Sequence, residues 1–121
     1  MLHAKKARKF GRVKSVRGAL LKGLAVSLIK HGKIQTTEAK AKELRKFIEP
    51  LVTIAKKATG TSGVTARRLI SSRLDNNLPE VKKLVSEIAP KFKDTPGGYT
   101  RIIKTSTRLK DSAKMAVIEF V

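Results

Sequence analysis

The side chains with the most obvious chemistry in this sequence are its cations. Lys and Arg number 28 against 9 Asp and Glu, so the formal net charge is +19. A small domain usually carries a net charge of about 2–8 in magnitude. An excess of this size repels itself until a polyanion neutralises it. These residues therefore predict a polyanionic partner, which means RNA, DNA or an anionic membrane.

The cations are concentrated in the N-terminal third of the chain. No acidic residue precedes Glu38, whereas the 37 residues before it contain ten Lys or Arg. Residues 1–14 have too few apolar side chains to build a core. We predict a basic arm over residues 1–14 that becomes ordered on a polyanion, and a single domain over residues 15–121. A solvated tail that only increases solubility is the alternative interpretation.

Residue types that usually carry catalysis are sparse. The sequence has no Cys, and its two histidines, His3 and His31, are far apart. A thiol nucleophile, a thiolate metal site and a disulfide framework are therefore excluded. The carboxylates are scattered, and no P-loop, HExxH or GxSxG motif occurs. We predict no enzymatic activity, no catalytic or metal-binding residue, no cofactor and no small-molecule substrate.

Aromatic residues decide which form of nucleic acid fits best. A single-strand binder stacks bases on grouped aromatic side chains, whereas this chain has four Phe, one Tyr and no Trp. Most of these five are expected in the core or in turns. We therefore predict recognition of folded RNA through phosphate and 2′-OH contacts. Phe10, set among Lys9, Gly11 and Arg12, either packs on the domain or wedges into RNA.

The apolar segments are too short to cross a bilayer. The longest, Ala19 to Ile29, has 11 residues and is interrupted by Lys22, whereas a spanning helix needs about 20. We expect no membrane partner. Because residues 1–31 lack acid and are partly amphipathic, binding at a membrane surface and a transit-sequence role for the arm are weaker alternatives.

Four helices are expected from the apolar periodicity and from residues that cap, end or kink helices. Leu20, Leu24 and Leu28 share a helical face, and Gly32 fits a C-terminal stop. Pro50 predicts a kink or two abutting helices in the second segment. Thr37 and Asn77 fit the caps of the second and fourth helices. The expected spans are Ser15 to His31, with Ser15 as cap, Glu38 to Ala58, Val64 to Leu74 and Leu78 to Ala89.

Three segments alternate between apolar and polar residues and are predicted to be strands: Lys33 to Thr36, Tyr99 to Thr105 and Met115 to Val121. The last two are joined by a polar hairpin loop of about eight to ten residues. The expected fold class is α+β, a single domain of about four helices beside a small, about three-stranded mixed sheet.

A family resemblance runs through nearly the whole chain. It is carried by Lys9-Phe10-Gly11-Arg12, Ala19-Leu20-Leu21, Ser27-Leu28, Thr36-Thr37, Lys40-Ala41-Lys42-Glu43-Leu44-Arg45, Glu49-Pro50-Leu51, Arg67-Arg68-Leu69, Gly97-Gly98-Tyr99-Thr100-Arg101-Ile102 and Ala113-Lys114-Met115-Ala116. In this order and spacing the sequence resembles the L-seventeen family of the bacterial large ribosomal subunit.

The resemblance implies a structural, non-catalytic ribosomal protein whose basic arm grips large-subunit ribosomal RNA. It also implies neighbouring large-subunit proteins, a place near the exit of the peptide tunnel, and a location in the ribosome of the cytoplasm or of a bacterium-derived organelle. Leu2, Ala4 and Val16 stand where the family usually has Arg, Arg and His. Those individual RNA contacts are therefore not expected here.

The charge pattern and the resemblance together select the candidate RNA-binding residues. They are His3, Lys5, Lys6, Arg8, Lys9, Arg12, Lys14, Arg17, Lys22, Arg67, Arg68, Arg101, Lys104, Arg108 and Lys110. The hairpin cations have a second interpretation, because charges on edge strands also deter sheet-to-sheet pairing. A DNA-compacting or other general nucleic-acid-binding protein is the alternative function, since it would share the charge.

Overall fold

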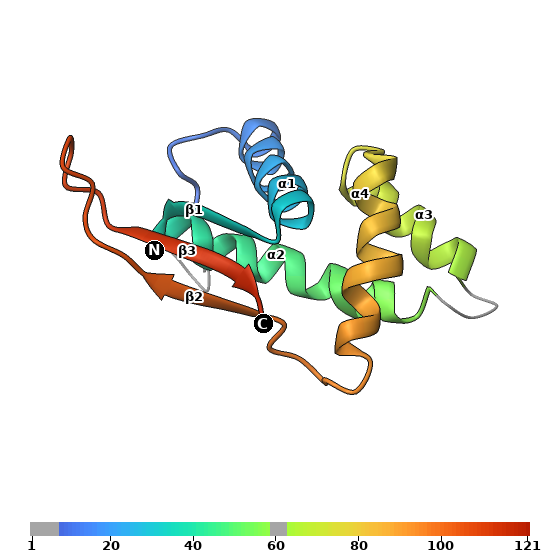
Figure 1. Ribbon diagram of the computed structural model, residues 1–121. Coiled ribbons are helices and arrows are strands. Elements are labelled where there is room, and N and C mark those ends of the chain that lie inside the picture. The colour runs from blue at the N-terminus through green and yellow to red at the C-terminus, as the bar shows by residue number, and fades with distance from the viewer. Residues whose placement is uncertain (1–7, 59–62) are drawn as a thin grey trace, which may run out of the picture.

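The computed structural model describes residues 8–58 and 63–121. Within them the elements are α1 (Lys14–His31), β1 (Lys33–Thr37), α2 (Glu38–Lys56), α3 (Gly63–Arg73), α4 (Leu78–Lys83), η1 (Leu84–Ile88), η2 (Ala89–Phe92), β2 (Thr100–Lys104) and β3 (Met115–Phe120). This is the expected α+β class. Figure 1 shows the sheet at one end of the molecule and α3 with α4 at the other.

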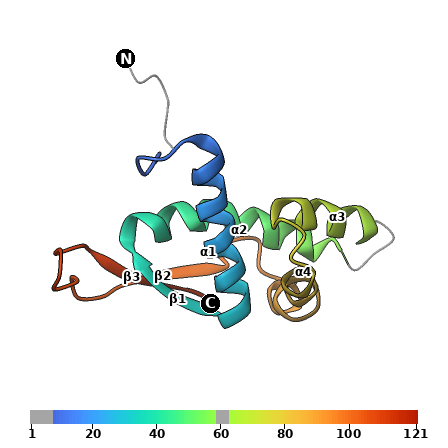
Figure 2. The ribbon, with the colours of Figure 1, turned by 90° about the horizontal axis from the view of Figure 1, so that it is seen from above.

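The long helix α2 is the element around which the others pack. It contacts α1, α3, η1, η2 and all three strands, and α1 crosses over it in Figure 2. Pro50 lies inside this single helix, so the expectation of two abutting helices was wrong. Its buried stripe includes Leu44, Ile48 and Leu51, as the 3.6-residue period predicted.

Two of the three capping and stop residues expected for the first two helices are observed in those roles. Gly32 ends α1 with φ of 80°, and its N–H donates to the carbonyl of Leu28 at 2.7 Å, the left-handed stop that Gly favours. The Thr37 hydroxyl caps α2 by accepting from the Lys40 N–H at 3.4 Å. The α1 cap is Val13 rather than Ser15, with no side-chain hydrogen bond.

The fourth predicted helix, Leu78 to Ala89, is observed as three successive segments, the last of which, η2, contains Pro90. Helix α4 passes into the π-helical turn η1, where the Ala89 N–H donates to the carbonyl of Leu84, and then into the 3₁₀ turn η2. Pro90 has no N–H, so the regular bonding pattern cannot continue through it. Asn77 does not cap α4 with its side chain. Its amide donates instead to the carbonyl of Leu74.

The sheet has the order β1-β3-β2 and both pairs are antiparallel. The expectation of a mixed sheet was therefore wrong: β1 and β2 run in the same direction, and β3 lies between them, antiparallel to both. Ile34, Ile118 and Ile102 are register partners. Ile118 is fully buried, and the other two pack against the core, so this face of the sheet covers α2.

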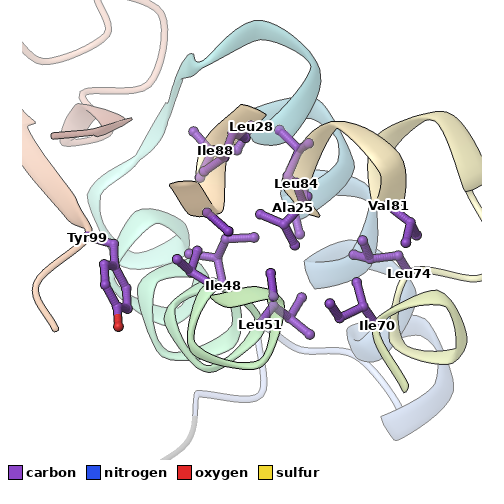
Figure 3. Close-up of a cluster of buried hydrophobic side chains, with 14 of the residues drawn as sticks. Ala25, Leu28, Ile48, Leu51, Ile70, Leu74, Val81, Leu84, Ile88 and Tyr99 are labelled. Atoms are coloured by element: carbon purple, nitrogen blue, oxygen red, sulfur yellow. The ribbon is translucent and has the colours of Figure 1, made fainter. Parts of the chain in front are cut away.

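The core lies where the helices converge on α2. Leu28 from α1, Ile48 from α2, Ile70 from α3 and Leu84 from η1 are fully buried. Figure 3 shows these side chains pointing toward one another from four elements. Phe92, Tyr99 and Phe120 form a second group. The ring centroid of Phe92 lies 5.2 Å from that of Tyr99 and 6.3 Å from that of Phe120. These three aromatics are therefore in packing roles, as expected.

Candidate nucleic-acid-binding surface

The segment that enters α1 presents cations from a turned backbone. Phe10 and Gly11 have φ of 53° and 61°, and the Arg12 N–H donates to the carbonyl of Lys9 at 3.1 Å. The Arg12 guanidinium also donates to the carbonyl of Phe10 at 2.8 Å. Phe10 is half-buried. Lys9 and Arg12 are exposed and have no carboxylate within 4 Å in residues 8–58 and 63–121.

A buried carboxylate holds the start of this segment. Glu43 on α2 is only 6% exposed and accepts from Arg8 at 3.1 Å and from Lys46 at 3.2 Å. A carboxylate at such a site needs cationic partners to offset its lost hydration. The sequence analysis missed Glu43. Its position on the core-facing stripe beside Leu44 was the available signal.

The three candidate cations on α1 differ in their surroundings. Lys14 and Arg17 lie in its first turn, with no ion pair to a described carboxylate. Lys22 pairs with Asp75, just after α3, at 2.8 Å. Gly18 and Gly23 have open space where a Cβ would project, so no part of the described chain needs the close approach that glycine permits.

The candidates on β2 are both paired. The sheet register places Arg101 opposite Glu119, and the two side chains form an ion pair. Lys104 lies 3.6 Å from Glu38, which also binds Lys42 at 3.0 Å. The hydrogen bond from Lys42 holds the pKa of Glu38 below its ordinary value, with Lys104 adding to the effect.

At the hairpin loop, Arg108 grips Asp111 with two hydrogen bonds. Nε donates to Oδ1 at 2.9 Å and Nη2 donates to Oδ2 at 2.7 Å. Together with the N–H of Ala113, this lowers the pKa of Asp111 to about 2. Arg108 thus shapes the tip of the loop, while the neighbouring Lys110 has no carboxylate within 4 Å in the described chain.

Gly97 and Gly98 lie just before β2, whose first residue is hydrogen-bonded to α2. Gly98 has φ of 64°, a value that side chains disfavour, and a Cβ at Gly97 would meet open space. Beyond them, Thr100 donates to Glu49 through both its N–H, at 3.2 Å, and its hydroxyl, at 2.9 Å. These bonds fix where β2 begins, whatever lies outside the turn.

Arg67 and Arg68 lie on α3 and are exposed. Figure 1 places α3 and the hairpin loop at opposite ends of the molecule, so the candidates do not form one patch. Sequence reasoning missed Lys82 on α4, which lines the same groove as the two arginines. His3, Lys5 and Lys6 lie outside the described residues.

Neither a metal centre nor a membrane span is found in the described chain. No cluster of three or more His, Asp or Glu side chains that could hold a metal ion occurs there. Among the described helices, none is long and apolar enough to cross a membrane.

Comparison with known proteins identifies the family of this chain. The family model "Ribosomal protein L17" matches residues 20–121. The large ribosomal subunit protein bL17 of Persephonella marina is 53% identical, with 100% of this chain and 95% of that protein aligned. The bL17 protein of Bacteroides fragilis is 51% identical, with all of this chain and 72% of that protein aligned. The bL17 protein of Sulfurimonas denitrificans is 49% identical, with both proteins aligned over their full length. The chain belongs to the ribosomal protein L17 family.

Proposed function

We propose that this protein is a structural constituent of the large ribosomal subunit that binds folded ribosomal RNA through phosphate contacts. The observation that carries the proposal is a net charge of +19, together with three exposed N-terminal cations, Lys9, Arg12 and Lys14, that have no described carboxylate partner. Unpaired cations release the counterions of a polyanion when they bind it. Membership in the L17 family supports the ribosome as the place where that RNA is met.

Within this proposal two sets of described cations have different roles. Lys9, Arg12, Lys14 and Arg17 contact phosphates directly. Arg101, Lys104 and Arg108 mainly stabilise the sheet and its loop, because each of them already forms an ion pair with a carboxylate. Residues 1–14 act as the arm that orders on RNA. The proposed role requires no catalysis, metal or cofactor.

The direct test is a gel-shift competition at fixed salt between large-subunit ribosomal RNA and duplex DNA of the same nucleotide concentration. The proposed function predicts that folded ribosomal RNA displaces the DNA and not the reverse. Preference for duplex DNA would support the alternative, a DNA-compacting protein. Sedimentation of the tagged chain with the large subunit in a gradient of cell lysate provides the test in the cell.

A further inference from the structure

Helices α3 and α4 pack together and leave an open groove on the outside of the molecule. Its volume is about 510 Å³. Leu78, Val81 and Val85 line it from the side of α4 and η1, and Arg67, Arg68 and Lys82 surround them. An apolar floor with a cationic rim is thus built from two helices that the core already holds in place.

The floor contains an apolar side chain that the core does not use. Leu78 is 65% exposed, whereas Leu74 and Leu84 are fully buried. Val81 and Val85 line the groove beside it, and both belong to the core. An exposed leucine in a groove with an apolar lining indicates a contact surface rather than a leucine scattered on the surface.

The rim resembles the N-terminal cations, and differs from those of the hairpin region, in having no internal partner among the described residues. Arg67, Arg68 and Lys82 make no ion pair with any carboxylate of residues 8–58 and 63–121. Three free cations around an apolar floor are complementary to a segment whose apolar side chains are flanked by Asp or Glu.

We propose that this groove docks such a segment, an amphipathic and acidic-flanked stretch of a neighbouring protein in the large subunit. The proposal rests on the proposed function and names one class of partner within it. RNA fits less well, because phosphates would satisfy the rim and leave Leu78 uncovered, and no aromatic side chain lines the groove to stack a base. A second copy fits less well too, because it would bring the same cations and a charge of +19.

The test places a diazirine amino acid at Ser86, which lines the groove and is exposed. Large subunits that carry this chain are purified and irradiated, and the adduct is digested with RNase or with protease. The control places the same amino acid at Leu109, which is 99% exposed in the hairpin loop. We expect the Ser86 adduct to resist RNase and to map to an apolar segment with adjacent Asp or Glu.

A second substitution tests whether formation of the Ser86 adduct depends on the apolar floor of the groove. Leu78→Asp puts a charge where an apolar side chain should dock, and should lower the Ser86 adduct by about tenfold or more. Because Leu78 is largely exposed in the first turn of α4, Asp there is compatible with folding. Leu109→Asp, the matched control, should leave the adduct unchanged.

Several outcomes would overturn the docking proposal: an adduct that RNase removes, an adduct to a second copy of this chain, no adduct in assembled subunits, or an adduct that survives Leu78→Asp. A chain that fails to sediment with the large subunit would instead contradict the proposed function, and the docking proposal with it.

Discussion

The N-terminal segment and the C-terminal hairpin look alike in sequence and differ in structure. Both concentrate Lys and Arg within about ten residues. In the hairpin region Arg101, Lys104 and Arg108 each meet a carboxylate, whereas Lys9 and Arg12 meet none among the described residues. The number of Lys and Arg residues therefore overestimates the number available for binding wherever the fold brings a carboxylate into contact with them. The free cations of the N-terminal segment are the ones that we expect to contact RNA.

The largest effect should be the salt dependence of RNA binding by the whole protein. If about 6–10 phosphates are neutralised, the affinity should fall roughly 10³–10⁵-fold between 50 and 200 mM salt. Filter binding across that range measures it. A flat response would show that the contacts are not electrostatic, and the distinction between free and paired cations would lose its meaning.

A deletion separates the first half of the arm, residues 1–7, from the half that Arg8 connects to Glu43. Removing residues 1–7 takes away Lys5 and Lys6 but keeps Arg8 and its bond to the buried Glu43. We expect weaker RNA binding, a salt slope lower by about 1 for each phosphate that the shortened chain no longer binds, and an unchanged melting temperature. Equal protease sensitivity of residues 5–14 with and without RNA would contradict an arm that orders on binding.

The hairpin loop offers a comparison between two neighbouring cations. Lys110→Ser removes a free cation, so it should lower the salt slope by about 1 if Lys110 touches a phosphate. Arg108→Ser should instead loosen the loop, seen as faster amide exchange at Ala113, whose N–H bonds to Asp111. Aggregation of Lys110→Ser with unchanged RNA affinity would favour the alternative interpretation, protection of a sheet edge.

The smallest expected effect is a pH dependence at the same loop. Arg108 lowers the pKa of Asp111 from 3.8 to about 2. The stabilisation that this pair gives is therefore present above about pH 4 and is lost as the pH falls toward 2. An NMR titration of the Asp111 carboxyl should show that low midpoint, and Arg108→Ser should return it toward the ordinary value. A midpoint that is unchanged in the variant would show that Arg108 is not the cause.

Local patterns predicted the elements well, because apolar periodicity and special residues act within a few positions. Gly32 and Thr37 end α1 and cap α2 as expected. The partners of the cations could not be predicted in the same way. Arg101 meets Glu119 only because β2 and β3 pair in one register, and Glu43 meets Arg8 across 35 residues of chain. Contacts between residues so far apart in the chain depend on how the elements pack. The local spacing of residues in a single sequence does not reveal that packing.

Two variants that remove the same charge from different places test the division between free and paired cations most directly. One changes Lys9, Arg12 and Lys14 to Ser, and the other changes Arg101, Lys104 and Arg108 to Ser, so both lose three positive charges. The measurement is the slope of log affinity for large-subunit ribosomal RNA against log salt, with melting temperatures as the folding control. The first variant should lower the slope by about 3 and the second by less than about 1. Equal changes in slope would show that only net charge matters, and would contradict that division.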